Sequence, residues 1–177
     1  MKKALLFFVP LAAVALCVLA FSFQTGNSQD KGSKVPDTSF KAINKDGAIN
    51  LSSLRGKVVF VNFFTTWCPS CKQEIPHLEG LYRKFKPKGV EVVGVSLDDK
   101  PAEKVREFAQ KMGISYPVGM PGKDSLTGFG MVTMIPTTFV LDASGAIQER
   151  LVGPYPQEAL EALAIRVLGG QAAKKAS

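Results

Sequence analysis

The sequence has few residues of the kinds that cross-link small domains or bind metal ions. Its 177 residues include three cysteines and a single histidine. Three cysteines cannot all pair within one chain, and one histidine leaves few ligands for a zinc site. Apolar residues make up 46% of the chain and charged residues 21%, proportions that exclude a disordered or collagen-like polypeptide. The length therefore suits one domain with an apolar core of its own.

Acidic residues are absent before Asp30, and two lysines precede an uncharged run from Ala4 to Phe23. A run of this length can span a bilayer, and the lysines predict that the chain begins in the cytoplasm and continues on the other side. The small residues Ala20 and Ser22 would also suit cleavage by a signal peptidase. We therefore expect residues 1–23 to be a signal anchor or a signal peptide of an extracytoplasmic (periplasmic) protein, with the inner membrane as a partner if the segment is retained.

The formal net charge of +7 does not by itself predict a nucleic-acid partner. Without the two lysines of the leader, 20 cations and 15 acids leave +5, which is spread without a basic block or interleaved aromatic residues. We therefore expect no binding to nucleic acid.

Residues 24–34 are rich in Gly, Ser, Asn, Gln and Lys, which is typical of a flexible linker. The apolar pattern of residues 35–170 then alternates between strand and helix, which indicates one α/β domain. Gly169 and Gly170 predict the end of the last helix, and residues 171–177 are expected to form a disordered tail. Strands are expected at 39–43, 48–51, 58–64, 90–97, 137–141 and 147–152, and helices at 68–86, 102–112 and 156–168.

Cys68 and Cys71 are separated by two residues at the expected junction of a strand and a helix. The first turn of a helix has unpaired N–H groups and the positive end of the helix dipole, and both stabilise a thiolate. We expect Cys68 to be the exposed, more readily ionised thiol that attacks a disulfide. Cys71 is expected to be the more buried thiol that resolves the mixed disulfide.

Two other interpretations of the pair are weaker. A zinc half-site would need a second pair of ligands, and only His77 and Cys17 remain, of which Cys17 lies in the leader. A purely structural disulfide is compatible with export, but closing so short a loop stabilises a fold little. Redox catalysis is the favoured interpretation.

Four further features accompany the cysteine pair. Trp67 directly precedes the first cysteine, and Pro76 lies five residues after the second. Residues 134–139 (MIPTTF) contain a proline ahead of an expected strand, and residues 55–59 (RGKVV) lead into residues 62–68 (NFFTTWC). With these motifs the chain resembles the thioredoxin superfamily and, within it, the membrane-tethered TlpA/ResA-like branch.

The resemblance covers residues 35–168 and implies a thioredoxin-like fold. Such a fold has a central mixed β-sheet flanked by helices, here with an N-terminal hairpin and a central helix–strand insertion over residues 98–131. The resemblance also implies that Pro136 is cis and that Ile135 and Pro136 bind the backbone of an extended substrate. Trp67 would supply an apolar wall for the substrate, although ordinary packing could also explain this residue.

The chain departs from thioredoxins at position 62. Thioredoxins have a buried aspartate there, whereas Asn62 cannot accept the proton of the resolving thiol, so another base or water must help. Related branch members place an acid after the strand that follows the active-site helix, and Asp99 aligns with that position. We therefore expect Asp99 to take part in proton transfer, while a solvated pair at the entry of a helix, Asp98 and Asp99, is the alternative.

The resemblance implies an extracytoplasmic thiol–disulfide oxidoreductase that reduces partner disulfides, such as those of apocytochrome c, and receives electrons from a membrane thiol donor. No cofactor is implied, and a monomer is expected. Two alternatives stay open: a peroxiredoxin-like peroxidase, and a non-enzymatic envelope binding module on a thioredoxin scaffold. Thr65 fits the peroxidase motif, but Val61 stands where that motif has a proline.

Overall fold

The computed structural model describes residues 31–176, with side chains described as far as residue 172. The expected signal segment 1–23 and linker residues 24–30 lie outside the described residues. Within the described part of the chain, none of the helices has the length and apolar character needed to cross a bilayer.

The described chain folds around a single mixed β-sheet of seven strands in the order β2-β1-β5-β4-β3-β6-β7. The neighbours β3–β4 and β4–β5 are parallel, and the other neighbours are antiparallel. In chain order the elements are β1 (Ser39–Ala42), β2 (Ala48–Asn50), η1 (Leu51–Leu54), β3 (Val58–Phe64), α2 (Pro69–Phe85), η2 (Lys86–Lys88), β4 (Val90–Ser96), α3 (Ala102–Lys111), β5 (Val118–Pro121), η3 (Thr127–Phe129), β6 (Thr137–Leu141), β7 (Ile147–Val152) and α4 (Gln157–Ala176).

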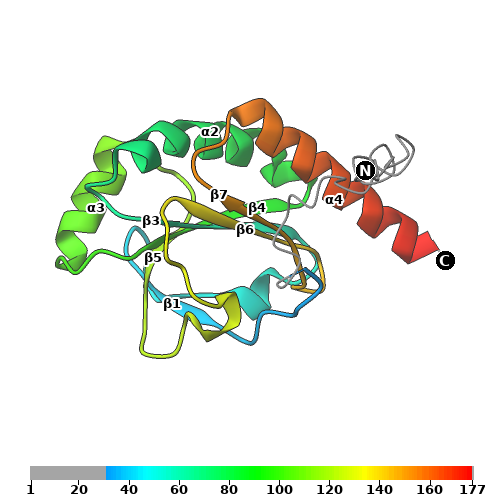
Figure 1. The fold of residues 1–177 in the computed structure, drawn as a ribbon, viewed down its shortest axis with the longest axis horizontal. Coiled ribbons are helices and arrows are strands. Elements are labelled where there is room, and N and C mark those ends of the chain that lie inside the picture. Colours follow the sequence, from blue (N-terminus) through cyan, green and yellow to red (C-terminus); the bar gives the residue numbers. More distant parts are fainter. Residues whose placement is uncertain (1–30, 177) are drawn as a thin grey trace, which may run out of the picture.

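The two faces of the sheet are covered differently. Figure 1 shows α2, α3 and α4 on one face, while the short helix η1 and the long connection after β5 lie on the other. Each face packs a separate apolar cluster. Strand β3 contributes to both, because alternate side chains of a strand point to opposite faces: Phe60 and Phe64 pack toward the helices, and Val61 and Phe63 pack toward the other side.

Several predicted elements are confirmed. The strands expected at 58–64, 137–141 and 147–152 have the observed bounds, and the N-terminal hairpin is formed by β1 and β2. Strands β3 and β6 are rich in Val, Phe or Thr, which suits the centre of a buried sheet. The expected helix–strand insertion is also present as α3 and β5.

Two expected boundaries were wrong. Helix α4 does not end at Gly169 and Gly170 but continues to Ala176. At the other end, the main chain of residues 32–34 is already part of the domain: Gly32 N donates to Ile147 O (2.8 Å) and Ile147 N donates to Ser33 O (2.9 Å). Residues 32–34 have the composition of a linker, but their backbone forms hydrogen bonds with the edge of the sheet and so belongs to the domain.

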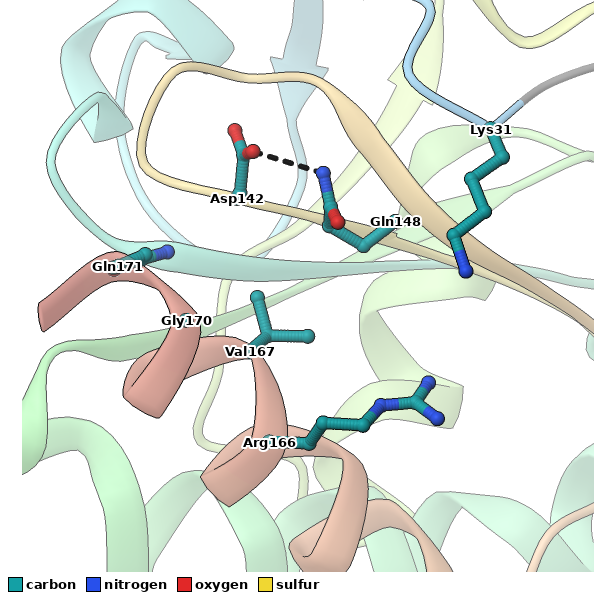
Figure 2. Close-up of a pocket in the computed structure, with 7 residues that line it drawn as sticks. All are labelled: Lys31, Asp142, Gln148, Arg166, Val167, Gly170 and Gln171. Atoms are coloured by element: carbon teal, nitrogen blue, oxygen red, sulfur yellow. Dashed lines mark hydrogen bonds between the residues drawn. The ribbon is translucent and has the colours of Figure 1, made fainter. Parts of the chain in front are cut away.

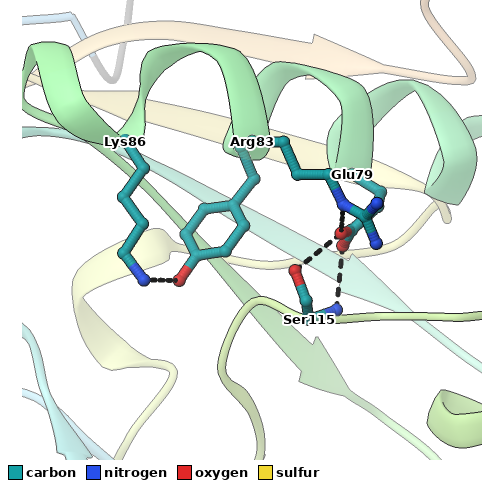
Figure 3. A network of polar contacts seen from close by, with 5 residues as sticks. Glu79, Arg83, Lys86 and Ser115 are labelled. Atoms are coloured by element: carbon teal, nitrogen blue, oxygen red, sulfur yellow. Dashed lines mark hydrogen bonds and ion pairs between the residues drawn. The ribbon is translucent and has the colours of Figure 1, made fainter.

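A polar network fixes the second half of α2 to the segment that precedes β5 (Figure 3). The Glu79 carboxylate accepts hydrogen bonds from Ser115 N (2.9 Å) and Ser115 Oγ (2.6 Å), and it also pairs with Arg83 one turn further on. Close by, Lys86 Nζ donates to the Tyr82 hydroxyl at 2.8 Å. The two bonds between Glu79 and Ser115 hold the helix that presents the cysteine pair.

Candidate active site

The two cysteines lie at the carboxyl end of β3, where the chain turns into α2. They form a disulfide with their Cα atoms 5.3 Å apart. Cys68 is the N-cap of α2, and its sulfur accepts a hydrogen bond from Cys71 N at 3.1 Å. The sulfur of Cys68 is therefore placed where a helix N-terminus favours negative charge, as the spacing of the pair predicts.

Both cysteines are largely buried in this disulfide form. Cys68 is 4% exposed and Cys71 is 1% exposed, so the expectation of an exposed Cys68 was wrong for the oxidised state. The disulfide draws the Cys68 sulfur toward the first turn of α2, where it also lies 3.3 Å from Ser70 Oγ. The order of exposure is nevertheless the expected one, with Cys71 deeper.

The segment before Cys68 is held by Asp98 rather than by Asp99. The buried carboxylate of Asp98 accepts hydrogen bonds from Thr66 N (2.8 Å), Thr66 Oγ1 (2.6 Å) and Ser96 Oγ (2.8 Å). Asp99, the residue expected to transfer a proton, is exposed. Asp98 therefore acts on the geometry of the turn that leads to Cys68.

The loop before β6 lies at the same end of the sheet as the cysteine pair. The Ile135–Pro136 peptide bond is cis, as the resemblance implies. The register that pairs Phe63 with Thr137 brings this loop to the same end of the sheet as the cysteines, and Ile135 packs against the cluster that contains them. Thr137 Oγ1 donates to Met134 O (2.7 Å), which fixes the turn.

Two large apolar side chains near the cysteines are exposed instead of buried. Trp67 is 60% exposed and Met134 is 62% exposed. Ordinary core packing therefore does not account for Trp67. Exposed aromatic and methionine side chains of this size are typical of surfaces that contact other proteins.

A buried carboxyl group, Glu74, lies one helical turn beyond Cys71. It is 1% exposed and accepts hydrogen bonds from Asn62 Nδ2 (2.9 Å) and from Tyr155 N (3.2 Å). Burial raises the pKa of Glu74 from 4.5 to about 7, although the hydrogen bonds from Tyr155 and Asn62 oppose this rise. Both forms of the carboxyl group are therefore populated at neutral pH.

Glu74 was missed by sequence reasoning, which sought a proton acceptor at Asp99. The signal was present in the spacing, because Glu74 directly precedes Ile75 and lies four residues before Leu78 on the buried face of α2. Asn62, the departure from thioredoxins, is the partner of this carboxyl group. Its amide also donates to Thr138 Oγ1 on β6 at 2.9 Å.

A cavity of about 290 Å³ lies away from the cysteine pair, between α4 and the hairpin of β6 and β7 (Figure 2). Lys31, Asp142, Gln148 and Arg166 are among its lining residues, and Gln148 donates to Asp142. None of the residues identified above at the cysteine site lines it. Among the described residues, no cluster of His, Cys, Asp and Glu side chains could hold a metal ion.

Comparison with known sequences gives a consistent result. Residues 31–150 match the sequence profile of the AhpC/TSA family. The chain is 33% identical to a thiol-disulfide oxidoreductase ResA of Bacillus cereus over 168 residues, which cover 91% of this chain and 95% of the relative. It is 32% identical to ResA of Bacillus anthracis over 90% of this chain and 94% of the relative. The chain belongs to the ResA-like thiol-disulfide oxidoreductases.

Solved structures agree with this family and with the thioredoxin-like fold. A thiol:disulfide interchange protein of the thioredoxin family from Chlorobium tepidum TLS is 31% identical, with a TM-score of 0.71 over 78% of this chain and 97% of that chain. StoA from Bacillus subtilis is 26% identical, with a TM-score of 0.63 over 73% of this chain and 97% of that chain.

As a ResA-like oxidoreductase, the chain carries its redox chemistry on the Cys68–Cys71 pair. The relatives described above do not favour the peroxidase or the binding module. Both cysteines of the disulfide belong to the N-cap and first turn of α2, outside the sheet. The arrangement thus suits thiol–disulfide exchange, with Glu74 as an ionisable group one helical turn from the buried Cys71.

Proposed function

We propose that this oxidoreductase acts outside the cytoplasm as a reductant of protein disulfides. The single observation that carries the proposal is the buried Glu74 carboxyl group one turn from Cys71 at the N-terminal end of α2. A protein that reduces disulfides must deprotonate its second thiol after the first has reacted, and Glu74 is a base within the fold for that step. Asn62 cannot supply it.

The reaction has two exchange steps. The Cys68 thiolate attacks one sulfur of the client disulfide, so a mixed disulfide forms and the other client sulfur leaves as a thiolate. Glu74 accepts the proton of Cys71, and the Cys71 thiolate attacks the Cys68 sulfur. The second client thiolate is released, and the enzyme is left with the disulfide that the structure contains. A dithiol donor at the membrane returns two electrons to the pair.

The client segment binds between Trp67 and the cis-proline loop. The exposed indole of Trp67 offers an apolar surface next to Cys68, and the backbone of Ile135, presented by its cis bond to Pro136, pairs with an extended strand of the client. The proposed clients are proteins whose paired cysteines must be reduced, such as apocytochrome c. Asp99 stays a second candidate for proton transfer, but its exposure favours Glu74.

Reduction of insulin tests the activity. With dithiothreitol as donor, the full chain is expected to accelerate insulin precipitation, and Cys68→Ser is expected to return the rate to that of dithiothreitol alone. Cys17→Ser, which changes the cysteine of the leader, is the matched control and is expected to keep the full rate. A reduction potential above about −200 mV would contradict the reductant direction, because such a pair accepts electrons from the glutathione pool.

Capture of clients tests the substrate. Cys71→Ser cannot resolve the mixed disulfide, so clients stay linked to Cys68 and can be identified by mass spectrometry. Apocytochrome c among the captured proteins would support the proposed client. If other proteins are captured and apocytochrome c is not, those proteins are the clients and the proposed client is rejected. A membrane-impermeant maleimide tests the location: it is expected to label the reduced Cys68 in intact cells, and labelling only after lysis would contradict an extracytoplasmic domain.

A further inference from the structure

The connection between β7 and α4 contains the sequence Pro154-Tyr155-Pro156. Neither proline has a backbone N–H, so Tyr155 N–H is the only backbone donor among the three residues. A residue that precedes a proline is restricted to extended conformations, and Tyr155 precedes Pro156. The segment is therefore a stiff strut with one hydrogen-bond donor.

Both polar groups of the Tyr155 main chain contact helix α2. Tyr155 N donates to Glu74 Oε1 at 3.2 Å, and Tyr155 O lies 2.9 Å from His77 Nδ1. Glu74 and His77 are three residues apart and so lie on the same side of α2. Tyr155 is thus held on α2 by hydrogen bonds at both its N–H and its carbonyl group.

The direction of the second bond follows from the chemistry of its partners. A carbonyl oxygen can only accept a hydrogen bond, so Nδ1 of His77 carries the hydrogen. That hydrogen is present in the neutral Nδ1–H tautomer and also in the imidazolium ion. The donor to the Tyr155 carbonyl is therefore present in either form of the ring.

We propose that His77 is a positioning residue for Glu74. Its Nδ1–H bond to the Tyr155 carbonyl holds the proline strut against α2, and this keeps the Tyr155 N–H on the Glu74 carboxylate. His77 does not touch the cysteines or the client in this account. The inference rests on the proposed role of Glu74 in proton transfer, and it names His77 as the residue that keeps the Tyr155 N–H on the Glu74 carboxylate.

The consequence for Glu74 has a definite sign. The Tyr155 N–H lowers the pKa of Glu74 against the larger effect of burial. If the strut loosens, the carboxylate loses this donor while Asn62 remains, and the acid form is favoured further. Tyr116 is the other titratable group whose pKa the charge of Glu74 affects, and Cys71 does not titrate in the oxidised protein because it is part of the disulfide.

Nuclear magnetic resonance of the full chain tests this assignment. The side-chain carboxyl carbons of Glu are labelled with ¹³C, the Glu74 signal is assigned by its loss in Glu74→Gln, and its titration is followed in the oxidised protein. His77→Phe keeps a planar ring but has no donor, and the midpoint for Glu74 is expected to rise by about half a pH unit or more. His77→Asn keeps an N–H donor close to the Nδ1 position and is expected to titrate like the parent.

Two results would overturn the proposal. One is a His77→Phe variant whose Glu74 midpoint equals that of the parent. The other is an equal shift in the Phe and Asn variants, which would mean that the ring and not the donor matters. Because the titration does not depend on turnover, these results are distinguishable from failure of the proposed reductase function, which insulin reduction reports separately.

Discussion

Helix α2 carries two glutamates whose surroundings have opposite effects on the carboxyl group. Glu74 lies one turn beyond Cys71 and has two hydrogen-bond donors, and burial raises its pKa to about 7. Glu79, which is drawn in Figure 3, is also penalised by burial, but hydrogen bonds from Ser115 and the contact with Arg83 outweigh that penalty and lower its pKa. The difference lies first in the deeper burial of Glu74, and then in the additional hydrogen-bond donor and the nearby cation at Glu79.

The two halves of α2 therefore have different roles: the first half carries the reactive groups, and the second half anchors the helix. At the first half of α2, an incompletely compensated carboxyl group is ready to exchange a proton near neutral pH. At the second half, a fully compensated carboxylate fastens the helix to the chain before β5. We expect substitutions in the two halves to change different properties.

The largest expected effect is on the pH dependence of stability in Glu74→Gln. In the folded parent, Glu74 keeps its proton up to about pH 7, whereas an exposed glutamate releases it near 4.5. The free energy of unfolding of the parent should therefore fall between about pH 4.5 and 7 by roughly 3 kcal/mol. Glu74→Gln lacks this fall, so the variant should gain on the parent as pH rises, as measured by denaturant unfolding of the oxidised protein.

Glu79→Gln is the matched control, with the opposite sign. Because the pKa of Glu79 is lowered, its contribution to stability is present above the usual value of 4.5 and is lost as pH falls through the folded-state pKa. The variant should be less stable than the parent at neutral pH, and the difference should shrink in acid. Equal pH profiles for the two variants would contradict the contrast between the glutamates.

Asp98→Ala should have the next largest effect. Asp98 is buried like Glu74 but accepts three hydrogen bonds, two of them from Thr66. Removing the carboxylate leaves those donors without a partner, which costs about 2 kcal/mol of stability, and the turn before Cys68 should loosen. The free energy of unfolding and the rate of insulin reduction are both expected to fall. Asp99 is the exposed neighbour of Asp98, and Asp99→Asn should change the free energy of unfolding by less than about 0.5 kcal/mol. If both variants lose the same stability, the distinction between Asp98 and Asp99 is rejected.

Glu74→Gln should also slow turnover. Without a base next to Cys71, insulin reduction at pH 7 is expected to fall by about tenfold, and the inflection near pH 7 in the rate profile should disappear. Glu79→Gln should keep the parent profile. If Asp99→Asn removes the inflection and Glu74→Gln does not, proton transfer belongs to Asp99.

The smallest expected effect is that of Ser115→Ala. The hydroxyl of Ser115 donates to Glu79 at an exposed position, so its loss should lower the free energy of unfolding by about 0.5 to 1 kcal/mol at pH 7. Insulin reduction should be unchanged. A loss of activity comparable with that of Glu74→Gln would show that the anchor and the active site are not separable.

The sequence was most informative where one strong pattern decides the structure. The continuous apolar run of β3 and the cysteine spacing at its end predicted the sheet and the redox pair. The extent of α4 was not predictable from Gly169 and Gly170, because helix-favouring residues follow them. Leu168 also packs against the apolar cluster on the helix side of the sheet. A glycine penalty of about 1 kcal/mol is small enough for such contacts to override.

The proton-transfer residue depended on details that spacing alone does not resolve. A shift of one position decides whether Asp98 or Asp99 turns inward at the end of β4, and strand pattern gives boundaries less accurately than that. Glu74 was overlooked because a glutamate in an amphipathic helix usually faces solvent. Its partners, Asn62 and Tyr155, come from distant parts of the chain and meet only in the fold.

The central claim is that Cys68 attacks and Cys71 resolves. It is tested most directly by mixing reduced Cys71→Ser with insulin and analysing the product by non-reducing electrophoresis and mass spectrometry. The expected result is a covalent complex linked through Cys68, which dithiothreitol dissolves and which the double variant Cys68→Ser/Cys71→Ser does not form. The absence of a complex in Cys71→Ser, or its presence in the double variant, would contradict the account.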